Sequence, residues 1–194
     1  MALEDGHKHE EALVAYDNAL RIAPQHIEAL LNRGNVLQTL KRWDLALNSY
    51  DKLIALAPNF ADAYNNRGNV LRALKRHQEA IASFDRALSF NPGYAQALNN
   101  KGIALKDLNR LSDALQCYDQ AIRLQPNYAE AFSNRGVALK DLSHMEPARI
   151  SFDRAIALNP NYAQAYGNRG GLLQELGKNK EALQDYEKAL TLDP

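Results

Sequence analysis

A period of 34 residues runs through the chain and constrains its fold more than any other feature. Six of the seven prolines keep this spacing, namely Pro24, Pro58, Pro92, Pro126, Pro160 and Pro194. Five glycines recur at the same interval, namely Gly34, Gly68, Gly102, Gly136 and Gly170. An aromatic residue follows each glycine by 16 residues, namely Tyr50, Phe84, Tyr118, Phe152 and Tyr186. So many residues in one register indicate successive copies of one structural unit.

The register divides the chain into four full repeats and two partial ones. With Gly34 placed at repeat position 8, the full repeats are residues 27–60, 61–94, 95–128 and 129–162. Residues 1–26 match the back of another repeat, and residues 163–194 lack only the last two positions. We therefore expect residues 1–194 to form one array.

Each repeat is predicted to contain two helices. In the second repeat, apolar and small residues recur at steps of three and four over residues 63–74, and again over residues 80–88. We call the first helix of a repeat helix A and the second helix B. Pro92 and Gly93 end helix B before the next helix A. One pair of helices cannot bury its own apolar face, so the pairs must stack into an all-α solenoid.

Small residues at repeat positions 8 and 20 predict a close approach of the two helices. Position 8 is the recurring glycine, and position 20 is alanine in Ala46, Ala80, Ala114, Ala148 and Ala182. Glycine costs a helix about 1 kcal/mol relative to alanine. Its recurrence indicates that close packing offsets this cost.

A 34-residue unit with these glycine, alanine, aromatic and proline positions resembles the tetratricopeptide repeat. The likeness is greatest to the repeat superhelix of O-linked N-acetylglucosamine transferases and of bacterial scaffold proteins. The resemblance implies a right-handed α-solenoid of stacked antiparallel helix pairs, with helix A lining the concave groove. It also implies that the groove binds a protein or peptide.

Repeat position 6 is asparagine in all five copies of helix A, namely Asn32, Asn66, Asn100, Asn134 and Asn168. Asparagine is a poor helix former, so its recurrence needs a reason. A side-chain amide can pair with both the N–H and the C=O of an extended peptide. Asn35 and Asn69, at position 9, extend this ladder, which is similar to the asparagine ladder of O-linked N-acetylglucosamine transferases. The alternative is that the amides tie neighbouring A helices together and bind nothing.

The remaining groove residues are mixed in character. Ile103 and Val137, at position 9, predict an apolar pocket, and Ser133 and Gly167, at position 5, predict extra room. The predicted basic groove residues, which face carboxylates, are Arg72, Lys106 and Lys140. Position 5 is never lysine, so the sequence lacks cationic anchors that family members use to grip chaperone C-terminal tails.

A basic residue recurs at position 7 and an acidic one at position 25. The basic residues are Arg33, Arg67, Lys101, Arg135 and Arg169, and the acidic ones are Asp51, Asp85, Asp119, Asp153 and Glu187. Because position 7 lies on the packed face of helix A, its cation needs a partner. We predict repeated ion pairs between helices, with a structural role.

Two local features depart from the pattern. Pro147 is the one proline out of register, in the first turn of a helix B, and it predicts a helix that starts late or is less stable. On the last helix B we expect Leu183, Leu190 and Leu192 to be exposed. Exposed leucines at the end of a solenoid predict end-to-end self-association.

Charge and composition exclude several function classes. The 23 basic and 23 acidic residues cancel, which argues against a nucleic-acid partner and against an anionic membrane surface. No apolar run approaches the roughly 18 residues of a membrane span. Cys117 is the single cysteine, so the chain has no internal disulfide and no multi-cysteine metal site. We expect no cofactor, no bound metal and a cytoplasmic location.

The sequence contains no recognisable catalytic set or phosphate-binding glycine loop. We therefore expect a non-catalytic protein–protein interaction scaffold that binds an extended segment in its concave groove. Two alternatives stay open: the recognition arm of a larger enzyme such as an O-GlcNAc-type glycosyltransferase, and a purely architectural spacer.

Overall fold

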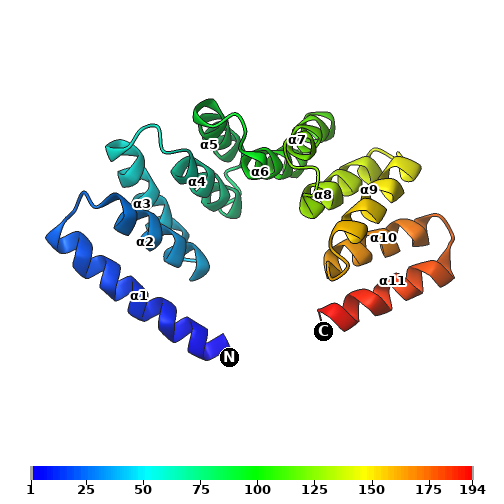
Figure 1. Cartoon of the computed structure of the whole chain (residues 1–194), viewed down its shortest axis with the longest axis horizontal. Coiled ribbons are helices and arrows are strands. Elements are labelled where there is room, and N and C mark those ends of the chain that lie inside the picture. Colours follow the sequence, from blue (N-terminus) through cyan, green and yellow to red (C-terminus); the bar gives the residue numbers. More distant parts are fainter. Residues whose placement is uncertain (1, 194) are drawn as a thin grey trace. The chain divides into compact units, whose positions relative to one another are not determined.

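The computed structural model describes the backbone of residues 2–193 and the side chains of residues 8–193. Within these residues the secondary structure is entirely helical (Figure 1). The helices are α1 (Ala2–Ile22), α2 (Ile27–Thr39), α3 (Trp43–Leu56), α4 (Ala61–Ala73), α5 (His77–Phe90), α6 (Ala95–Asp107), α7 (Leu111–Leu124), α8 (Ala129–Asp141), α9 (Met145–Leu158), α10 (Ala163–Glu175) and α11 (Asn179–Leu192). The even-numbered helices are the A helices, and the odd-numbered ones are the B helices.

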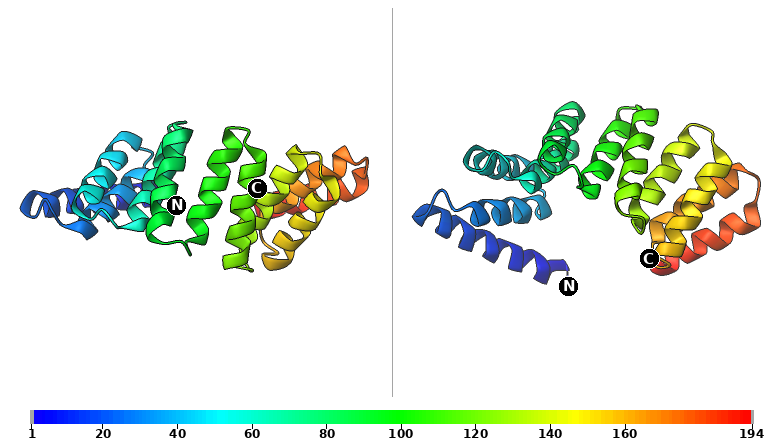
Figure 2. Two further views of the ribbon diagram at one scale, coloured as in Figure 1. Left: turned by 90° about the horizontal axis from the view of Figure 1, so that it is seen from above. Right: turned by 45° about the horizontal axis from the view of Figure 1, so that its top comes forward.

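The helices form two compact units, residues 1–93 with α1–α5 and residues 94–194 with α6–α11. Within each unit, every helix packs against the next one along the chain (Figures 1 and 2). Successive A helices also touch, in the pairs α2–α4, α6–α8 and α8–α10. Each unit is therefore a stack of helices in which α2, α4, α8 and α10 lie against the B helices before and after them, while α6 lies against α7.

The recurring glycine lets helix A approach the aromatic ring of helix B in the same repeat. A Cβ atom on Gly68 would lie 2.5 Å from Cε1 of Phe84, and one on Gly136 would lie 2.6 Å from Cε1 of Phe152. Carbon atoms in contact are about 3.5–4.0 Å apart, so no larger residue fits without movement. Both rings are fully buried, and the predicted close approach is confirmed.

Each A–B connection is a tight turn. In the first full repeat, the N–H of Arg42 donates to the carbonyl of Leu37 at 2.8 Å, and that of Lys41 donates to Gln38 at 3.0 Å. A left-handed residue gives the turn its shape: the φ angle is 56° at Lys41 and 74° at Gly177. This is the Schellman ending of a helix, which uses carbonyls that the helix leaves without partners.

Two details differ from the sequence-based expectations. The first partial repeat has no A–B turn, because α1 runs without a break from Ala2 to Ile22. Pro147 does not delay its helix, because α9 starts at Met145, the same repeat position at which α7 starts. Pro147 is the third residue of α9, where the backbone N–H has no helical acceptor in any case.

Candidate functional site: the A-helix face

The predicted groove residues lie on one face of the A helices. We define the A-helix face by repeat positions 2, 6, 9, 12 and 13, carried by α2 and α4 in the first unit and by α6, α8 and α10 in the second. The predicted binding residues on it are Asn32, Asn35, Asn66, Asn69, Arg72, Asn100, Ile103, Lys106, Asn134, Val137, Lys140 and Asn168. Most of them are half-buried, whereas Asn35 is exposed and Asn100 is only 9% exposed.

In the first unit, the amides join α2 to α4. Nδ2 of Asn66 donates to Oδ1 of Asn35 at 3.0 Å, and the hydroxyl of Tyr50 donates to the same oxygen at 2.7 Å. Asn65 adds a bond from its Nδ2 to Oδ1 of Asn66 at 3.2 Å. Burial raises the pKa of Tyr50 well above its usual value, so this hydroxyl remains a donor at neutral pH.

In the second unit, the position-6 amides of α8 and α10 join each of these two helices to the A helix before it. Nδ2 of Asn134 donates to Oδ1 of Asn99 at 2.9 Å, and Nδ2 of Asn168 donates to Oγ of Ser133 at 3.3 Å. Asn99 in turn donates to Oε1 of Glu130 at 3.1 Å. The interpretation that these amides tie neighbouring A helices together is therefore confirmed for Asn134 and Asn168, which donate to position 5, and for Asn66, which donates to position 9 of the preceding A helix. Capture of a peptide main chain remains a prediction.

Position 5 is not part of the open surface. Asn65, Asn99 and Ser133 are 1%, 0% and 1% exposed, so the expectation that Ser133 makes the groove roomier is wrong. Asn99 and Ser133 lie between adjacent A helices of the second unit, where they accept the position-6 amides of Asn134 and Asn168. Gly167 differs, because a Cβ atom there would have no neighbour within 4 Å.

The apolar pair on this face is partly used in packing. Val137 packs against the buried cluster that contains Leu139, Phe152 and Leu172, and Ile103 is half-buried. Each side chain thus keeps some accessible surface. The apolar pocket predicted beside them remains a prediction.

The charged residues of the face pair with one another. Nζ of Lys140 lies 2.8 Å from Oε1 of Glu175 on the next A helix, and Nζ of Lys106 lies 4.0 Å from Asp107. Arg72 is half-buried on α4. Exposed pairs of this kind contribute little to stability, so their carboxylates and amines can exchange partners at small cost.

The four arginines at position 7 form the predicted ion pairs, each with an aspartate of the preceding repeat. Arg33 binds Asp17, Arg67 binds Asp51, Arg135 binds Asp119 and Arg169 binds Asp153, at N–O distances of 2.6–2.7 Å. The same guanidinium groups donate to a position-23 serine of their own repeat in three cases, namely Ser49, Ser83 and Ser151, each at 2.7 Å. The arginines at position 7 thus link neighbouring repeats by ion pairs, and we assign them a structural role.

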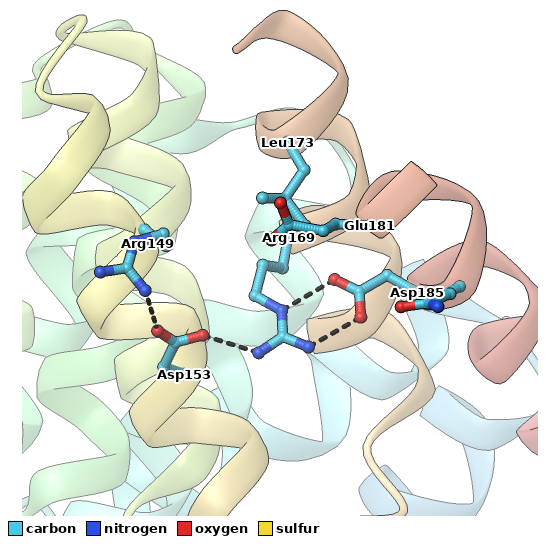
Figure 3. A pocket seen from close by; sticks show the side chains of 7 residues that line it. Arg149, Asp153, Arg169, Leu173, Glu181 and Asp185 are labelled. Carbon is cyan, nitrogen blue, oxygen red and sulfur yellow. Dashed lines mark hydrogen bonds and ion pairs between the residues drawn. The ribbon is translucent and has the colours of Figure 1, made fainter. Parts of the chain in front are cut away.

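The last repeat carries an ion network that the sequence analysis missed (Figure 3). Asp185 stands at position 23, and both of its oxygens accept from Arg169 at 2.7 Å. Asp153 bridges Arg169 and Arg149 at 2.6 and 2.8 Å. These residues, with Leu173, line a cleft of about 200 Å³. The signal was present in the sequence, since a carboxylate replaces the usual small residue at position 23.

None of the helices in the described part of the chain combines the length and the apolar character that a membrane span requires. Likewise, no three histidine, cysteine or acidic side chains among residues 8–193 lie close enough together to hold a metal ion. The groups that the A-helix face presents are the amides, apolar side chains and paired charges described above.

Four family models match the chain. Three are described as tetratricopeptide repeat and match residues 31–95, 129–162 and 163–194, and one is described as TPR repeat and matches residues 102–143. No curated protein matches. Together the models account for most of the chain.

Several solved structures are similar to the chain. The type IV pilus biogenesis factor PilW is 26% identical with a TM-score of 0.85, over 100% of this chain and 89% of PilW. YrrB, described as a TPR protein with an unusual peptide-binding site, is 26% identical with a TM-score of 0.67, over 93% of each chain. MamA of Desulfovibrio magneticus RS-1 is 20% identical with a TM-score of 0.73, over 86% of this chain and 94% of MamA. The predicted all-α solenoid fold is confirmed.

Proposed function

Because the chain belongs to the tetratricopeptide repeat family, we propose that it is a non-catalytic scaffold that binds an extended peptide or protein segment along its A-helix face. The similar protein YrrB carries a peptide-binding site, which supports a peptide as the ligand. The balanced charge of the chain and the pairing of Lys140 with Glu175 on the face support a ligand without strong charge of one sign.

The observation that carries the proposal is the row of partly accessible asparagine amides. Asn134 and Asn168 each donate one amide hydrogen to the preceding repeat and are still half-buried rather than buried. A carboxamide has two donor hydrogens and two acceptor lone pairs, so one bond leaves capacity for a ligand. A peptide main chain repeats the complementary donor and acceptor at every residue.

The second candidate is the architectural spacer, and the bonds between repeats favour it. If the amides serve only to hold α8 and α10 in place, the face binds no peptide. The two candidates predict different peptide affinities for variants in which a residue of the A-helix face that does not bridge repeats is replaced.

The test selects peptides from a displayed random library on the purified chain and measures their affinity by fluorescence anisotropy. Ile103→Asp places a charge on the A-helix face, and we expect selected peptides to bind at least tenfold more weakly. Ile150→Asp is the matched control, because Ile150 is an exposed isoleucine on the B helix α9. Its affinity should equal that of the parent chain.

Asn69→Ala removes an amide of the face, and we expect a smaller loss, of about threefold to tenfold for one hydrogen bond. Replacing peptide bonds of a selected ligand with N-methylated ones should weaken binding if main-chain groups are captured. Failure to enrich any peptide, or equal affinity for the parent chain and the Ile103→Asp chain, would support the spacer instead.

A further inference from the structure

Glu130 is an exposed carboxylate on the A-helix face of the second unit, in the first turn of α8. The same repeat position is glutamine in α6 and α10, namely Gln96 and Gln164, so Glu130 is the one acidic residue at position 2 in this unit. No basic side chain among residues 8–193 forms an ion pair with it. The charge of Glu130 is therefore not neutralised within the described part of the chain.

A buried amide holds this carboxylate in place. Asn99 of α6 is 0% exposed, and its Nδ2 donates to Oε1 of Glu130 at 3.1 Å. Oδ1 of Asn99 in turn accepts from Nδ2 of Asn134 at 2.9 Å, so hydrogen bonds fix the Asn99 amide at both of its polar atoms. A carboxylate has about four lone-pair sites, so one bond to Asn99 leaves acceptor capacity for a ligand.

Two tyrosine hydroxyls lie near the same carboxylate. Tyr128 directly precedes α8 and Tyr162 directly precedes α10, and both side chains are half-buried. Burial, and then the charge of Glu130, raise the pKa of both hydroxyls, so both are protonated at neutral pH. The hydroxyl of Tyr162 donates to Oε1 of Gln164 at 3.4 Å, which leaves its oxygen able to accept. The carboxylate and the two phenolic oxygens together offer several acceptors to a cation.

The basic residue on the same face of α8 is too distant to cancel the charge of Glu130. Lys140 follows Glu130 by ten residues, which corresponds to about 15 Å of helix rise. Its Nζ lies 2.8 Å from Oε1 of Glu175. Exposed charges are largely screened from one another beyond about 8 Å at physiological ionic strength. The A-helix face is therefore negative around Glu130, whereas the pair near the end of α8 is neutral.

We propose that Glu130, with the hydroxyls of Tyr128 and Tyr162, binds one lysine or arginine side chain of the segment that lies along the A-helix face. This inference rests on the proposed function, because the basic side chain belongs to that segment. An ammonium or guanidinium group carries the complementary charge and donates several hydrogen bonds, which are stronger when they are charge-assisted. The site thus selects a cation at one position of the ligand, and the rest of the ligand need not be basic.

The test uses peptides selected on the parent chain from the displayed library, and we expect a lysine or arginine at one fixed position. Replacing this residue with norleucine, which has no charge, should weaken binding to the parent chain about tenfold. The Glu130→Gln chain, whose amide oxygen can still accept from Asn99, should bind both peptides with nearly equal affinity. Glu181→Gln is the matched control and should keep the tenfold difference, because Glu181 is an exposed glutamate in the first turn of the B helix α11.

A double variant tests the two hydroxyls. Tyr128→Phe combined with Tyr162→Phe should weaken binding of the basic peptide about threefold and leave the affinity for the norleucine peptide unchanged. Enriched peptides without a fixed basic residue, or the same tenfold difference in the Glu130→Gln chain, would overturn the inference while the proposed function stands. Failure to enrich any peptide would overturn both.

Discussion

Two glycines of the second unit, Gly136 and Gly167, occupy opposite environments on helices with the same register. A Cβ atom on Gly136 would lie 2.6 Å from the ring of Phe152, whereas one on Gly167 would meet nothing within 4 Å. Both glycines cost their helix about 1 kcal/mol relative to alanine. Packing around each glycine therefore decides whether its replacement by alanine raises or lowers the free energy of unfolding.

We expect Gly136→Ala to destabilise the chain by about 1–3 kcal/mol, because the clash with a buried ring outweighs the gain in helix propensity. Gly167→Ala should stabilise it by up to about 1 kcal/mol. Urea unfolding followed by circular dichroism measures both values. Equal effects of the two substitutions would show that the ring of Phe152 moves without cost.

A second contrast at this scale concerns Asp185, whose side chain is 8% exposed and holds Arg169 with two bonds. Serine holds the equivalent arginine in three other repeats. We expect Asp185→Ser to cost about 1 kcal/mol and Asp185→Leu about 2–3 kcal/mol, because leucine offers the guanidinium no acceptor. Thermal and urea unfolding rank the two variants. The reverse order would mean that Asp153 alone satisfies Arg169.

The hydroxyl of Tyr128 makes part of the stability depend on alkaline pH. Burial, and then the charge of Glu130, raise the pKa of Tyr128 from 10.0 to about 12. The hydroxyl of Tyr128 therefore loses its proton at lower pH in the unfolded chain than in the folded one. Its contribution to the free energy of unfolding is complete below pH 10 and is lost as the pH rises to about 12. Urea midpoints measured from pH 9 to 11.5 should fall less steeply for Tyr128→Phe than for the parent chain. Parallel curves would contradict the assignment.

At the scale of the helix, the first turn of α9 contains Pro147 without any delay in the start of the helix. Pro147 is the third residue of α9, and the first helical bond runs from the N–H of Ala148 to the carbonyl of His144 at 3.0 Å. We expect Pro147→Ala to change the free energy of unfolding by less than about 0.5 kcal/mol. Ala155→Pro, in the buried middle of the same helix, should cost 3 kcal/mol or more. A large loss for Pro147→Ala would assign the proline a role in folding.

The helices themselves were largely predictable, because a 34-residue period repeats each signal five times. The A–B turns were harder to define, since they end in Schellman motifs with a left-handed Lys41 or Ser143 where glycine would be the usual marker. The binding face was predicted only in part. Rotation by 100° per residue places position 5 on the same side of helix A as positions 9 and 12. The burial of Asn99 depends on contact with the neighbouring A helix, which the pattern of one helix cannot reveal.

The pairing of Arg67 with Asp51 shows the same limit. The residue types and positions predicted an ion pair. The repeat that supplies the aspartate depends on how one helix pair stacks on the next. A periodic sequence cannot distinguish these choices, because every repeat offers the same partner.

At the scale of the whole molecule, bonds and clusters of this kind link neighbouring repeats within each unit, so the stability of a unit should be the sum of repeat and nearest-neighbour contributions. The two compact units, residues 1–93 and 94–194, allow a paired test by native-state hydrogen exchange. Gly68→Ala should lower amide protection most in α4 and α5 and in the adjoining α3. Gly136→Ala should do so in α8 and α9 and in the adjoining α7 and α10. Uniform loss of protection in all helices for either variant would show that the chain unfolds as one cooperative block, in which the clash at a single glycine is felt by every repeat alike.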